Sequence, residues 1–243
     1  MFLSRPPQPT IRIFVDFDGT IVPQDVGNFF FEQFSGSAMW DDNRLYVAGE
    51  ISAGELYRRN TARIAAIDES MIDAFCSRFA VDPAFPVFTA WAQAEGYPLM
   101  ILSDGLDAYI ERILRAAGCE AEYRANHLSL RPEGGCDVIL PTPDEVCDRC
   151  ANCKRNHMLT HSGDRDVVVL IGDGISDFCP AHYADLVFAK GKLERHCQQE
   201  NIRFRRYDDF GDVLAAMQRM IASRSLQRRG QTELRRNDVW RQG

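Results

Sequence analysis

Three apolar runs of the chain are each followed at once by acidic or hydroxyl side chains. These side chains are Asp16 and Asp18 after the first run, Ser103 and Asp104 after the second, and Asp173 and Asp177 after the third. Carboxylates that converge repel one another strongly at partial burial unless a cation lies among them. Oxygen ligands of this kind favour Mg²⁺. The pattern therefore predicts a magnesium site, with Lys154 as a nearby positive charge.

The apolar runs that precede these residues have the composition of buried strands. Residues 11–17, 99–102 and 167–171 are short and apolar and give way to polar or glycine residues, and residues 186–189 form a fourth run. Helical patterns lie between them, and the pattern at residues 107–117 ends at a glycine. Strands that alternate with helices predict a mainly parallel α/β sheet. Because such sheets bind ligands beyond the carboxyl ends of their strands, we expect the acidic residues to meet at one edge.

The remaining segments suggest how the chain is divided into domains. Residues 23–81 have helical periodicity without a strand run, which predicts a helical insertion after the first strand. Residues 1–22 and 82–222 then form the core domain, and residues 123–140 within it predict a hairpin or a long ordered loop. Arg, Gln, Gly and Ser dominate after that, so we expect residues 223–243 to be a basic, flexible tail.

Composition limits the partners of the protein. The formal net charge of -7 at pH 7 argues against a broad nucleic-acid surface, which needs clustered Lys and Arg. The longest apolar runs fall far short of the roughly 20 residues that cross a bilayer, and the N-terminus lacks the apolar stretch of a signal peptide. Eight cysteines are too few for a disulfide scaffold at this length. We therefore expect a cytoplasmic protein without a nucleic-acid or membrane partner.

Three cysteines, Cys147, Cys150 and Cys153, form a cluster just before the lysine. With a fourth ligand such as His157 or His161, the cluster could bind zinc. The alternative is three reduced thiols packed beside the loop that carries the lysine. We favour the thiol interpretation because the C-x-x-C repeat lacks a clear second pair.

Taken together, the motifs resemble the four signatures of the haloacid dehalogenase superfamily. In chain order they are Asp16-Phe17-Asp18-Gly19-Thr20, Ser103-Asp104-Gly105, Lys154 and Gly172-Asp173-Gly174-Ile175-Ser176-Asp177. The resemblance covers residues 11 to 210 in outline. It implies an α/β fold with a Rossmann-like parallel sheet core, a small helical cap inserted after the first strand, and magnesium-dependent phosphatase activity on a small phosphorylated metabolite.

The resemblance also implies a role for each motif residue. Asp16 would attack phosphorus and form an aspartyl phosphate, while Asp18 would protonate the leaving alcohol and activate the attacking water. Magnesium would bind the Asp16 carboxylate, the Asp18 backbone carbonyl and Asp173, and Asp177 would be a further ligand or would support one. The groups that would bind the phosphoryl oxygens are Thr20, Ser103, the Gly105 amide and Lys154.

The insertion resembles the small cap of the phosphoserine phosphatase branch, where substrate specificity lies. In that branch an acidic residue nine positions after the nucleophile contacts the substrate amine, and this chain has Asp25 there. A helix N-cap or a solvated charge is the alternative role for Asp25.

Closer similarity exists to bacterial phosphatases of methionine salvage that act on 2-hydroxy-3-keto-5-methylthiopentenyl-1-phosphate. The shared features are Asn126-His127, the cysteine cluster before the lysine, and residues 197–201 leading to Tyr207. One departure is Asp104, which stands where those enzymes have glycine. The pair Ser103-Asp104 resembles the same motif in phosphoethanolamine and phosphocholine phosphatases. An added carboxylate near the leaving group would favour a cationic substrate.

Other functions that fit the same motifs are a phosphotransferase and a non-catalytic module that binds phosphate for regulation. The intact pair Asp16 and Asp18 favours an enzyme, because a binding module needs no acid–base group at the second position.

Overall fold

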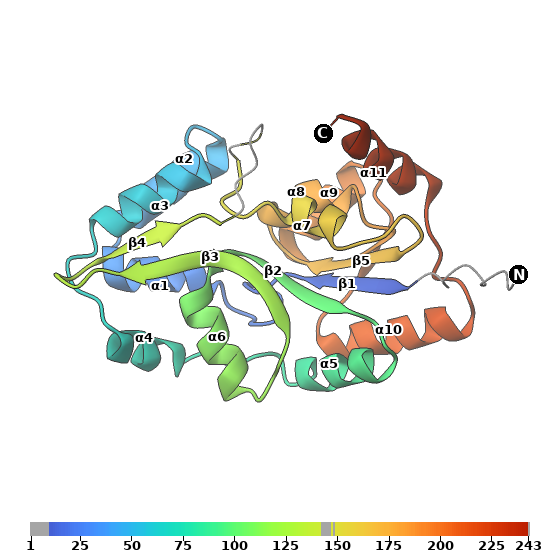
Figure 1. The fold of residues 1–243 in the computed structure, drawn as a ribbon, viewed down its shortest axis with the longest axis horizontal. Helices are drawn as coiled ribbons and strands as arrows, with labels where there is room; N and C mark the ends of the chain where they lie inside the picture. The colour runs from blue at the N-terminus through green and yellow to red at the C-terminus, as the bar shows by residue number, and fades with distance from the viewer. Residues whose placement is uncertain (1–9, 142–146, 148, 243) are drawn as a thin grey trace, which may run out of the picture.

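A sheet of seven strands forms the centre of the computed structural model, which describes residues 10–141, 147 and 149–242, with side chains up to residue 239 (Figure 1). The strands are β1 (Ile11–Val15), β2 (Leu99–Leu106), β3 (Glu122–Leu130), β4 (Cys136–Ile139), β5 (Val167–Gly172), β6 (Leu186–Ala189) and β7 (Phe204–Arg206). Their order across the sheet is β4-β3-β2-β1-β5-β6-β7. Neighbours pair in parallel except β3 and β4, which form an antiparallel hairpin. The predicted α/β fold with a parallel sheet is confirmed.

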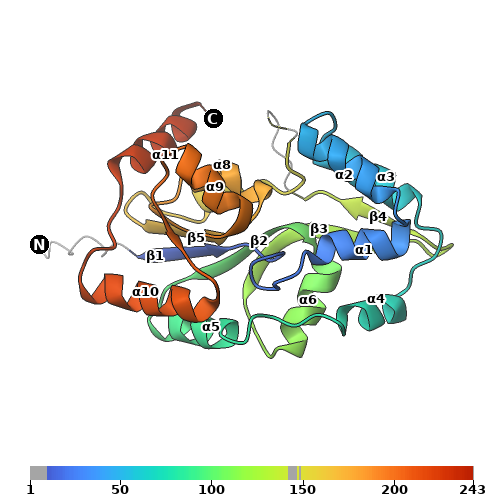
Figure 2. The ribbon, with the colours of Figure 1, turned by 180° about the vertical axis from the view of Figure 1, so that it is seen from behind.

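Helices cover both faces of this sheet (Figures 1 and 2). The helices of the core are α5 (Phe85–Ala94), α6 (Asp107–Ala116), α7 (Lys154–Thr160), α8 (Phe178–Ala181), α9 (Gly191–Gln199) and α10 (Phe210–Ala222). Side chains of α5, α6 and α10 pack with Ile13 and Val15 on one face, and side chains of α7, α8 and α9 pack with Phe14 on the other. Because successive strand residues point to opposite faces, β1 supplies both hydrophobic clusters.

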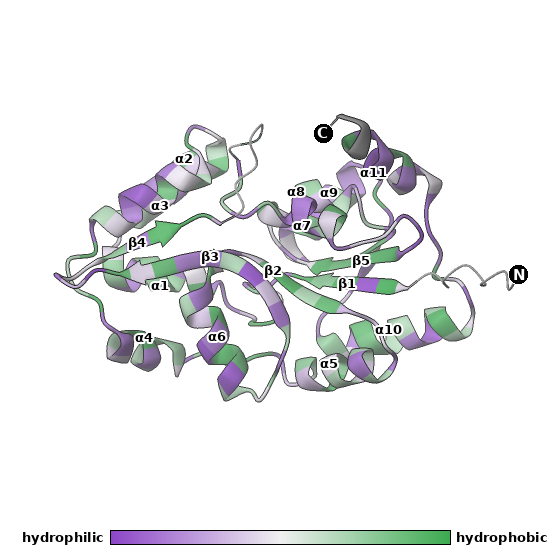
Figure 3. Cartoon of the chain, viewed as in Figure 1, coloured by the Kyte–Doolittle hydropathy of each residue, from purple (hydrophilic) through white to green (hydrophobic). Residues whose placement is uncertain are grey.

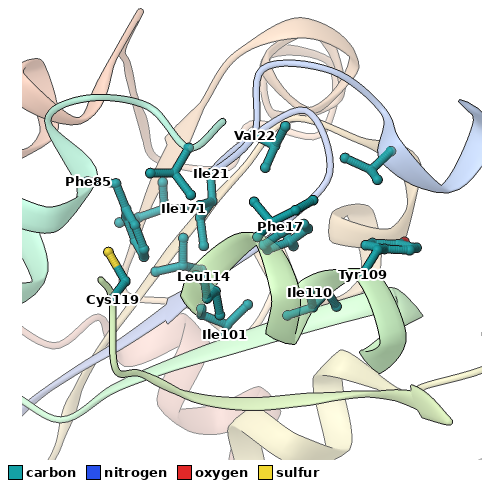
Figure 4. Close-up of a cluster of buried hydrophobic side chains, with 14 of the residues drawn as sticks. Phe17, Ile21, Val22, Phe85, Ile101, Tyr109, Ile110, Leu114, Cys119 and Ile171 are labelled. Atoms are coloured by element: carbon teal, nitrogen blue, oxygen red, sulfur yellow. The ribbon is translucent and has the colours of Figure 1, made fainter. Parts of the chain in front are cut away.

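The first of these clusters lies directly beneath the motif that follows β1 (Figure 4). Phe17 and Ile21 are fully buried in it beside Ile171 of β5, so the loop after β1 is anchored by its apolar residues while its aspartates remain at the sheet edge. Figure 3 shows that β5 is hydrophobic along its length, whereas α3 and α6 carry hydrophobic and hydrophilic residues alternately. A strand buried on both faces has the continuous apolar sequence that predicted it.

The segment between β1 and α5 folds as helices, as its periodicity predicts. These are α1 (Val26–Ser35), α2 (Met39–Ala48), α3 (Ala53–Ala62) and α4 (Glu69–Cys76). They gather at the end of the sheet where β1 terminates (Figures 1 and 2). The insertion therefore lies over the edge where the acidic residues follow the strands.

Most predicted elements are present, with two additions. The hairpin predicted at residues 123–140 is formed by β3 and β4. The strand β2 continues past the predicted residues 99–102 to Leu106, with an irregularity in its pairing with β3 after Leu102. The strand β7 has three residues, and the sequence analysis missed it because Phe204–Arg206 is short and mostly charged. Among the described residues, no helix is long and apolar enough to cross a membrane.

The expected flexible tail has a different structure, because Gly230–Gln242 forms the helix α11. This helix is attached to the core through Asp185, which is fully buried. Asp185 accepts hydrogen bonds from the Thr232 hydroxyl, from the backbone N–H of Arg229 and from Arg236, whose Nη1 lies 3.2 Å from Oδ2. The polar composition of this segment predicted a solvated tail, because composition does not reveal a single buried ion pair such as that of Arg236 with Asp185.

We expect Arg236→Met to destabilise the protein. The substitution leaves the buried Asp185 carboxylate without its cation, and removing one partner of a buried pair typically costs about 3 to 5 kcal/mol. The free energy of unfolding in urea measures the loss, with Arg235→Met, at an exposed neighbouring position, as the control. Equal stability of the two variants would contradict an anchoring role for this pair.

Candidate active site

The end of β1 places Asp16 at the centre of the predicted site. Its backbone N–H donates to the carbonyl of Ile171 at 2.9 Å, which continues the pairing of β1 with β5. The residue is 5% exposed, and its Oδ1 accepts a hydrogen bond of 2.8 Å from the N–H of Phe17. The regular strand therefore fixes both the position and the orientation of this carboxylate.

The first residue of α7, Lys154, lies between two carboxylates. Its Nζ is 2.6 Å from Asp16 Oδ1 and 2.7 Å from Asp177 Oδ1, and the lysine is 2% exposed. These two carboxylates outweigh the effect of burial and raise the pKa of Lys154, so the lysine stays charged. Burial and the neighbouring Asp177 raise the pKa of Asp16 well above its usual value, and Lys154 opposes this.

Three carboxylates could share a metal ion, as the sequence predicts. One oxygen each of Asp16, Asp173 and Asp177 lies within 4.8 Å of the others. Asp173 accepts a hydrogen bond of 2.9 Å from the Thr20 hydroxyl, and burial and Asp177 raise the pKa of Asp173 to about 6. Burial and mutual repulsion raise the pKa values of Asp16 and Asp173, and a divalent cation bound among them would offset that repulsion. The donor set consists of hard carboxylate oxygens, which fit Mg²⁺.

Asp177 differs from the other two because both of its oxygens already have partners. Oδ1 meets Lys154, and Oδ2 accepts hydrogen bonds of 3.2 Å from the backbone N–H groups of Asp173 and Gly174. A Cβ atom on Gly172 would lie 2.3 Å from Asp177 Oδ2, so only glycine fits there. Asp177 therefore stabilises the loop that carries Asp173, and it also binds Lys154.

Asp18 lies on the other side of the site and is held by three donors. Its Oδ1 accepts from the N–H of Gly27 at 3.1 Å, and its Oδ2 accepts from the hydroxyls of Tyr109 at 3.0 Å and Ser103 at 3.3 Å. Loss of solvent around the carboxylate, followed by repulsion from Asp25, raises the pKa of Asp18 to about 7, while the bonds from Gly27 and Tyr109 act in the opposite direction. A carboxyl group with such a pKa can both donate and accept a proton near neutral pH.

Ser103 and Gly105 lie next to this carboxylate, at the irregular end of β2. Ser103 is fully buried, and its Oγ accepts a hydrogen bond of 2.9 Å from the N–H of Gly105. An incoming phosphate group would have to exchange this internal bond for bonds to its own oxygens. The four groups predicted to bind phosphate therefore lie at one edge of the sheet. They are Thr20, Ser103, the Gly105 amide and Lys154.

Tyr109 is a site residue that the sequence analysis missed. Its ring is buried in the hydrophobic cluster of Figure 4, and its hydroxyl group donates a hydrogen bond to Asp18. In the sequence it occupies an apolar position of the helical pattern of α6, which gives no sign of a polar contact. The signal that was available is a tyrosine at a core position, since a buried tyrosine hydroxyl usually has a hydrogen-bond partner.

We expect Gly105→Ala to lower activity strongly. A Cβ atom there would lie 1.8 Å from the Tyr109 hydroxyl and 2.9 Å from Asp18 Oδ2, so both groups must move. A shift of about 1 Å in a catalytic group can cost about 10²-fold in rate. The measurement is kcat/KM, with Gly54→Ala on α3 as the control, because a Cβ there meets its nearest neighbour at an ordinary 3.4 Å. Full activity in the Gly105 variant would show that Asp18 need not be held in this position.

Asp104 points to the loop before α7. Its Oδ1 accepts a hydrogen bond of 2.7 Å from the N–H of Asn152, which is fully buried and also donates to the carbonyls of Ser103 and Arg124 at 2.8 and 3.0 Å. Burial raises the pKa of Asp104 to about 6, and the bond from Asn152 acts against this. Asp104 lines the cavity of the site, but its carboxylate is engaged in holding the loop that leads to Lys154.

The cysteine cluster lies on the same loop. Cys147 is exposed, Cys150 is half-buried and Cys153 is buried. Burial, the neighbouring Asp104 and nearby thiols raise the pKa of Cys150 to about 12, so the metal-free thiol stays protonated. Within the described part of the chain, the acidic, cysteine and histidine side chains close enough to share a metal are the three aspartates alone. The zinc hypothesis therefore has no support in the structure.

Asp25 is the N-cap of α1, the alternative that the sequence analysis left open. Its carboxylate accepts from the backbone N–H of Asn28 at 2.9 Å and from the Asn28 side chain at 2.6 Å. It also lines a cavity of about 390 Å³ whose lining includes Asp16, Asp18 and residues of helices α1 to α3. This cavity is large enough for a small metabolite.

Comparisons with known proteins agree with this geometry. A family model described as haloacid dehalogenase-like hydrolase matches residues 13–182. The chain is 26% identical over 212 residues to a 2-hydroxy-3-keto-5-methylthiopentenyl-1-phosphate phosphatase of Exiguobacterium sibiricum, covering 86% of this chain and 97% of the relative. It is 27% identical over 234 residues to the polyol phosphate phosphatase PYP1 of Saccharomyces cerevisiae, covering 86% and 93%. The solved structure of a phospho-aspartyl intermediate analogue of phosphoserine phosphatase aligns with a TM-score of 0.64 and 16% identity over 86% of this chain and 99% of that one.

Proposed function

Because the chain belongs to the family of haloacid dehalogenase-like hydrolases, we propose that it is a magnesium-dependent phosphomonoesterase that forms an aspartyl phosphate on Asp16. The observation that carries the proposal is the contact of the buried Lys154 with Asp16, opposite the separately held Asp18. Lys154 can neutralise the phosphate that Asp16 attacks. Asp18 has a pKa suited to proton transfer.

The hydrogen bonds of Asp16 support Oδ2 as the attacking oxygen in this proposal. Among the described residues, the donors that contact this carboxylate are the Phe17 N–H and Lys154, and both meet Oδ1. Oδ2 is therefore the oxygen left to form a bond to phosphorus. As that bond forms, the bond from phosphorus to the leaving oxygen breaks, and Asp18 gives its proton to that oxygen.

The second step returns the enzyme to its starting state. Asp18, now a carboxylate, takes a proton from a water molecule, whose oxygen attacks phosphorus and breaks the bond to Asp16. The products are an alcohol and inorganic phosphate. Lys154, Ser103 and the N–H of Gly105 stabilise the charge on the phosphoryl oxygens in both steps. Asp16 and Asp173 would hold Mg²⁺, which supplies positive charge to the phosphoryl group when bound.

For the substrate, we propose a small phosphorylated alcohol or enol. Support comes from the size of the cavity and from the relatives, one named for the 2-hydroxy-3-keto-5-methylthiopentenyl-1-phosphate of methionine salvage and one for polyol phosphates. Phosphoserine, phosphoethanolamine and phosphocholine are the alternatives. Release of inorganic phosphate from a panel of these compounds, with magnesium present, tests the proposal. If the protein releases phosphate from none of these compounds, the proposed function is overturned.

We expect chelation to stop the reaction. Without a divalent cation the acidic cluster repels a phosphate dianion, so EDTA should remove the activity and an excess of Mg²⁺ should restore it. Phosphate release from one good substrate provides the measurement. A thermal melt under the same conditions serves as the control, because it separates loss of metal from loss of fold. Activity that survives complete chelation would contradict the magnesium assignment.

A further inference from the structure

The cavity has a polar wall that the proposed mechanism does not use. The helices α1, α2 and α3 contribute the amide-bearing residues Asn28, Asn43 and Asn60 to its lining. An amide presents either a donor or an acceptor to a ligand, and its other contacts decide which. The hydrogen bonds of these residues therefore indicate what kind of group the wall recognises.

The amide of Asn43 has a fixed orientation, because it belongs to a chain of hydrogen bonds that begins at a carboxylate. As a carboxylate, Asp25 only accepts hydrogen bonds, so the Asn28 side chain directs its NH₂ group to it, at 2.6 Å. The oxygen of Asn28 then accepts from Nδ2 of Asn43 at 2.8 Å. This leaves Oδ1 of Asn43 without a hydrogen-bond partner among the described residues, on a side chain that lines the cavity. The chain also polarises that oxygen, because each bond strengthens the next.

The amide of Asn60 has the opposite orientation. Its Oδ1 accepts a hydrogen bond of 3.1 Å from Nη1 of Arg63, so its NH₂ group remains for other partners. Asn60 is 1% exposed, yet it lines the same cavity. Asn43 therefore offers an acceptor at this wall, while Asn60 keeps its NH₂ group as a donor. A hydroxyl group both donates and accepts, and it matches this combination.

We propose that Asn43, oriented by Asp25 through Asn28, selects substrates whose leaving group carries a hydroxyl that donates a hydrogen bond to its amide oxygen. The inference rests on the proposed phosphatase function and adds a specificity residue to it. Asp25 then acts on specificity through Asn28, in addition to capping α1. A leaving group without a donor covers the Asn43 oxygen and leaves it without a hydrogen bond, which disfavours binding of that substrate.

Three phosphate monoesters of similar size test the proposal. They are 2-hydroxyethyl phosphate, which donates and accepts, 2-methoxyethyl phosphate, which only accepts, and n-propyl phosphate, which does neither. The quantity compared is the ratio of kcat/KM values between esters within one protein, followed from the wild type to Asn43→Leu. Comparing ratios across proteins cancels the intrinsic reactivity of each ester. The control is Asn237→Leu on α11, the same substitution away from the cavity.

We expect Asn43→Leu to lower the preference for the hydroxyethyl over the propyl ester by about 3- to 10-fold, which corresponds to one hydrogen bond. Asp25→Asn allows the amide chain to reverse, so it should lower the preference for the hydroxyethyl over the methoxyethyl ester. The control should keep both wild-type ratios. Unchanged ratios in the Asn43 variant would overturn the proposal. An unchanged ratio in the Asp25 variant alone would overturn the orientation by Asp25. Release of phosphate from none of the esters by the wild type would count against the phosphatase function itself.

Discussion

Asp16→Asn should abolish turnover and leave the fold intact. The amide has the shape of the carboxylate but is a very poor nucleophile, and loss of a covalent nucleophile costs on the order of 10⁴- to 10⁶-fold in rate. The substitution also removes one of the three carboxylates of the acidic cluster, and it leaves Asp177 as the carboxylate paired with Lys154. The measurement is kcat for phosphate release with magnesium at saturating substrate.

A thermal melt of the Asp16 variant is the necessary control, because Asp16 is buried at the end of a central strand. Removal of one buried negative charge from a repelling cluster should not lower the melting temperature, since the cluster disfavours that charge. Retained multiple turnover at a rate near the wild type would exclude a covalent role for Asp16.

Asp18→Asn should slow the reaction by about 10²- to 10⁴-fold, the usual contribution of general acid–base catalysis. The asparagine keeps its place between Gly27 and Tyr109, but it can neither give a proton to the leaving oxygen nor take one from water. A substrate with a good leaving group separates the two steps. With p-nitrophenyl phosphate the first step needs little protonation, whereas hydrolysis of the aspartyl phosphate still needs a base.

The variant should therefore release a burst of p-nitrophenolate, close to one equivalent per active site, followed by slow turnover. Stopped-flow absorbance measures the amplitude and both rates. The Asp16→Asn protein is the matched control, because it should show no burst. Steady-state rates near the wild type for both alkyl and nitrophenyl esters would contradict the assigned role of Asp18.

Local sequence patterns were sufficient to predict most of the sheet and the edge at which the acidic residues meet. Strands such as β1 and β5 are buried on both faces, so each one is a continuous apolar run that ends where a polar loop begins. Because parallel strands end at the same edge, Asp16, Ser103 and Asp173 could be expected to meet. Lys154 begins a helix between β4 and β5 and follows no strand, so its role at the site was implied by the resemblance to a known superfamily.

Contacts between distant segments were not predictable in the same way. The bond from Tyr109 to Asp18 joins residues 91 positions apart, and the bond from Asn152 to Asp104 joins residues 48 positions apart. Asp104 was expected to face the leaving group because its position in a motif is known, but its orientation depends on a loop that sequence patterns do not place. The packing of α11 was also missed, because it depends on the contact of Arg236 with the distant Asp185.

The central claim is that a phosphoryl group is transferred to Asp16, and borohydride trapping tests it most directly. Borohydride reduces an aspartyl phosphate to homoserine, and mass spectrometry of peptides then locates the changed residue. We predict homoserine at position 16 when the protein is quenched during turnover, and more of it in the Asp18→Asn variant, where hydrolysis of the intermediate is slow. Active turnover without any reduction at Asp16, or homoserine at another aspartate instead, would contradict the account.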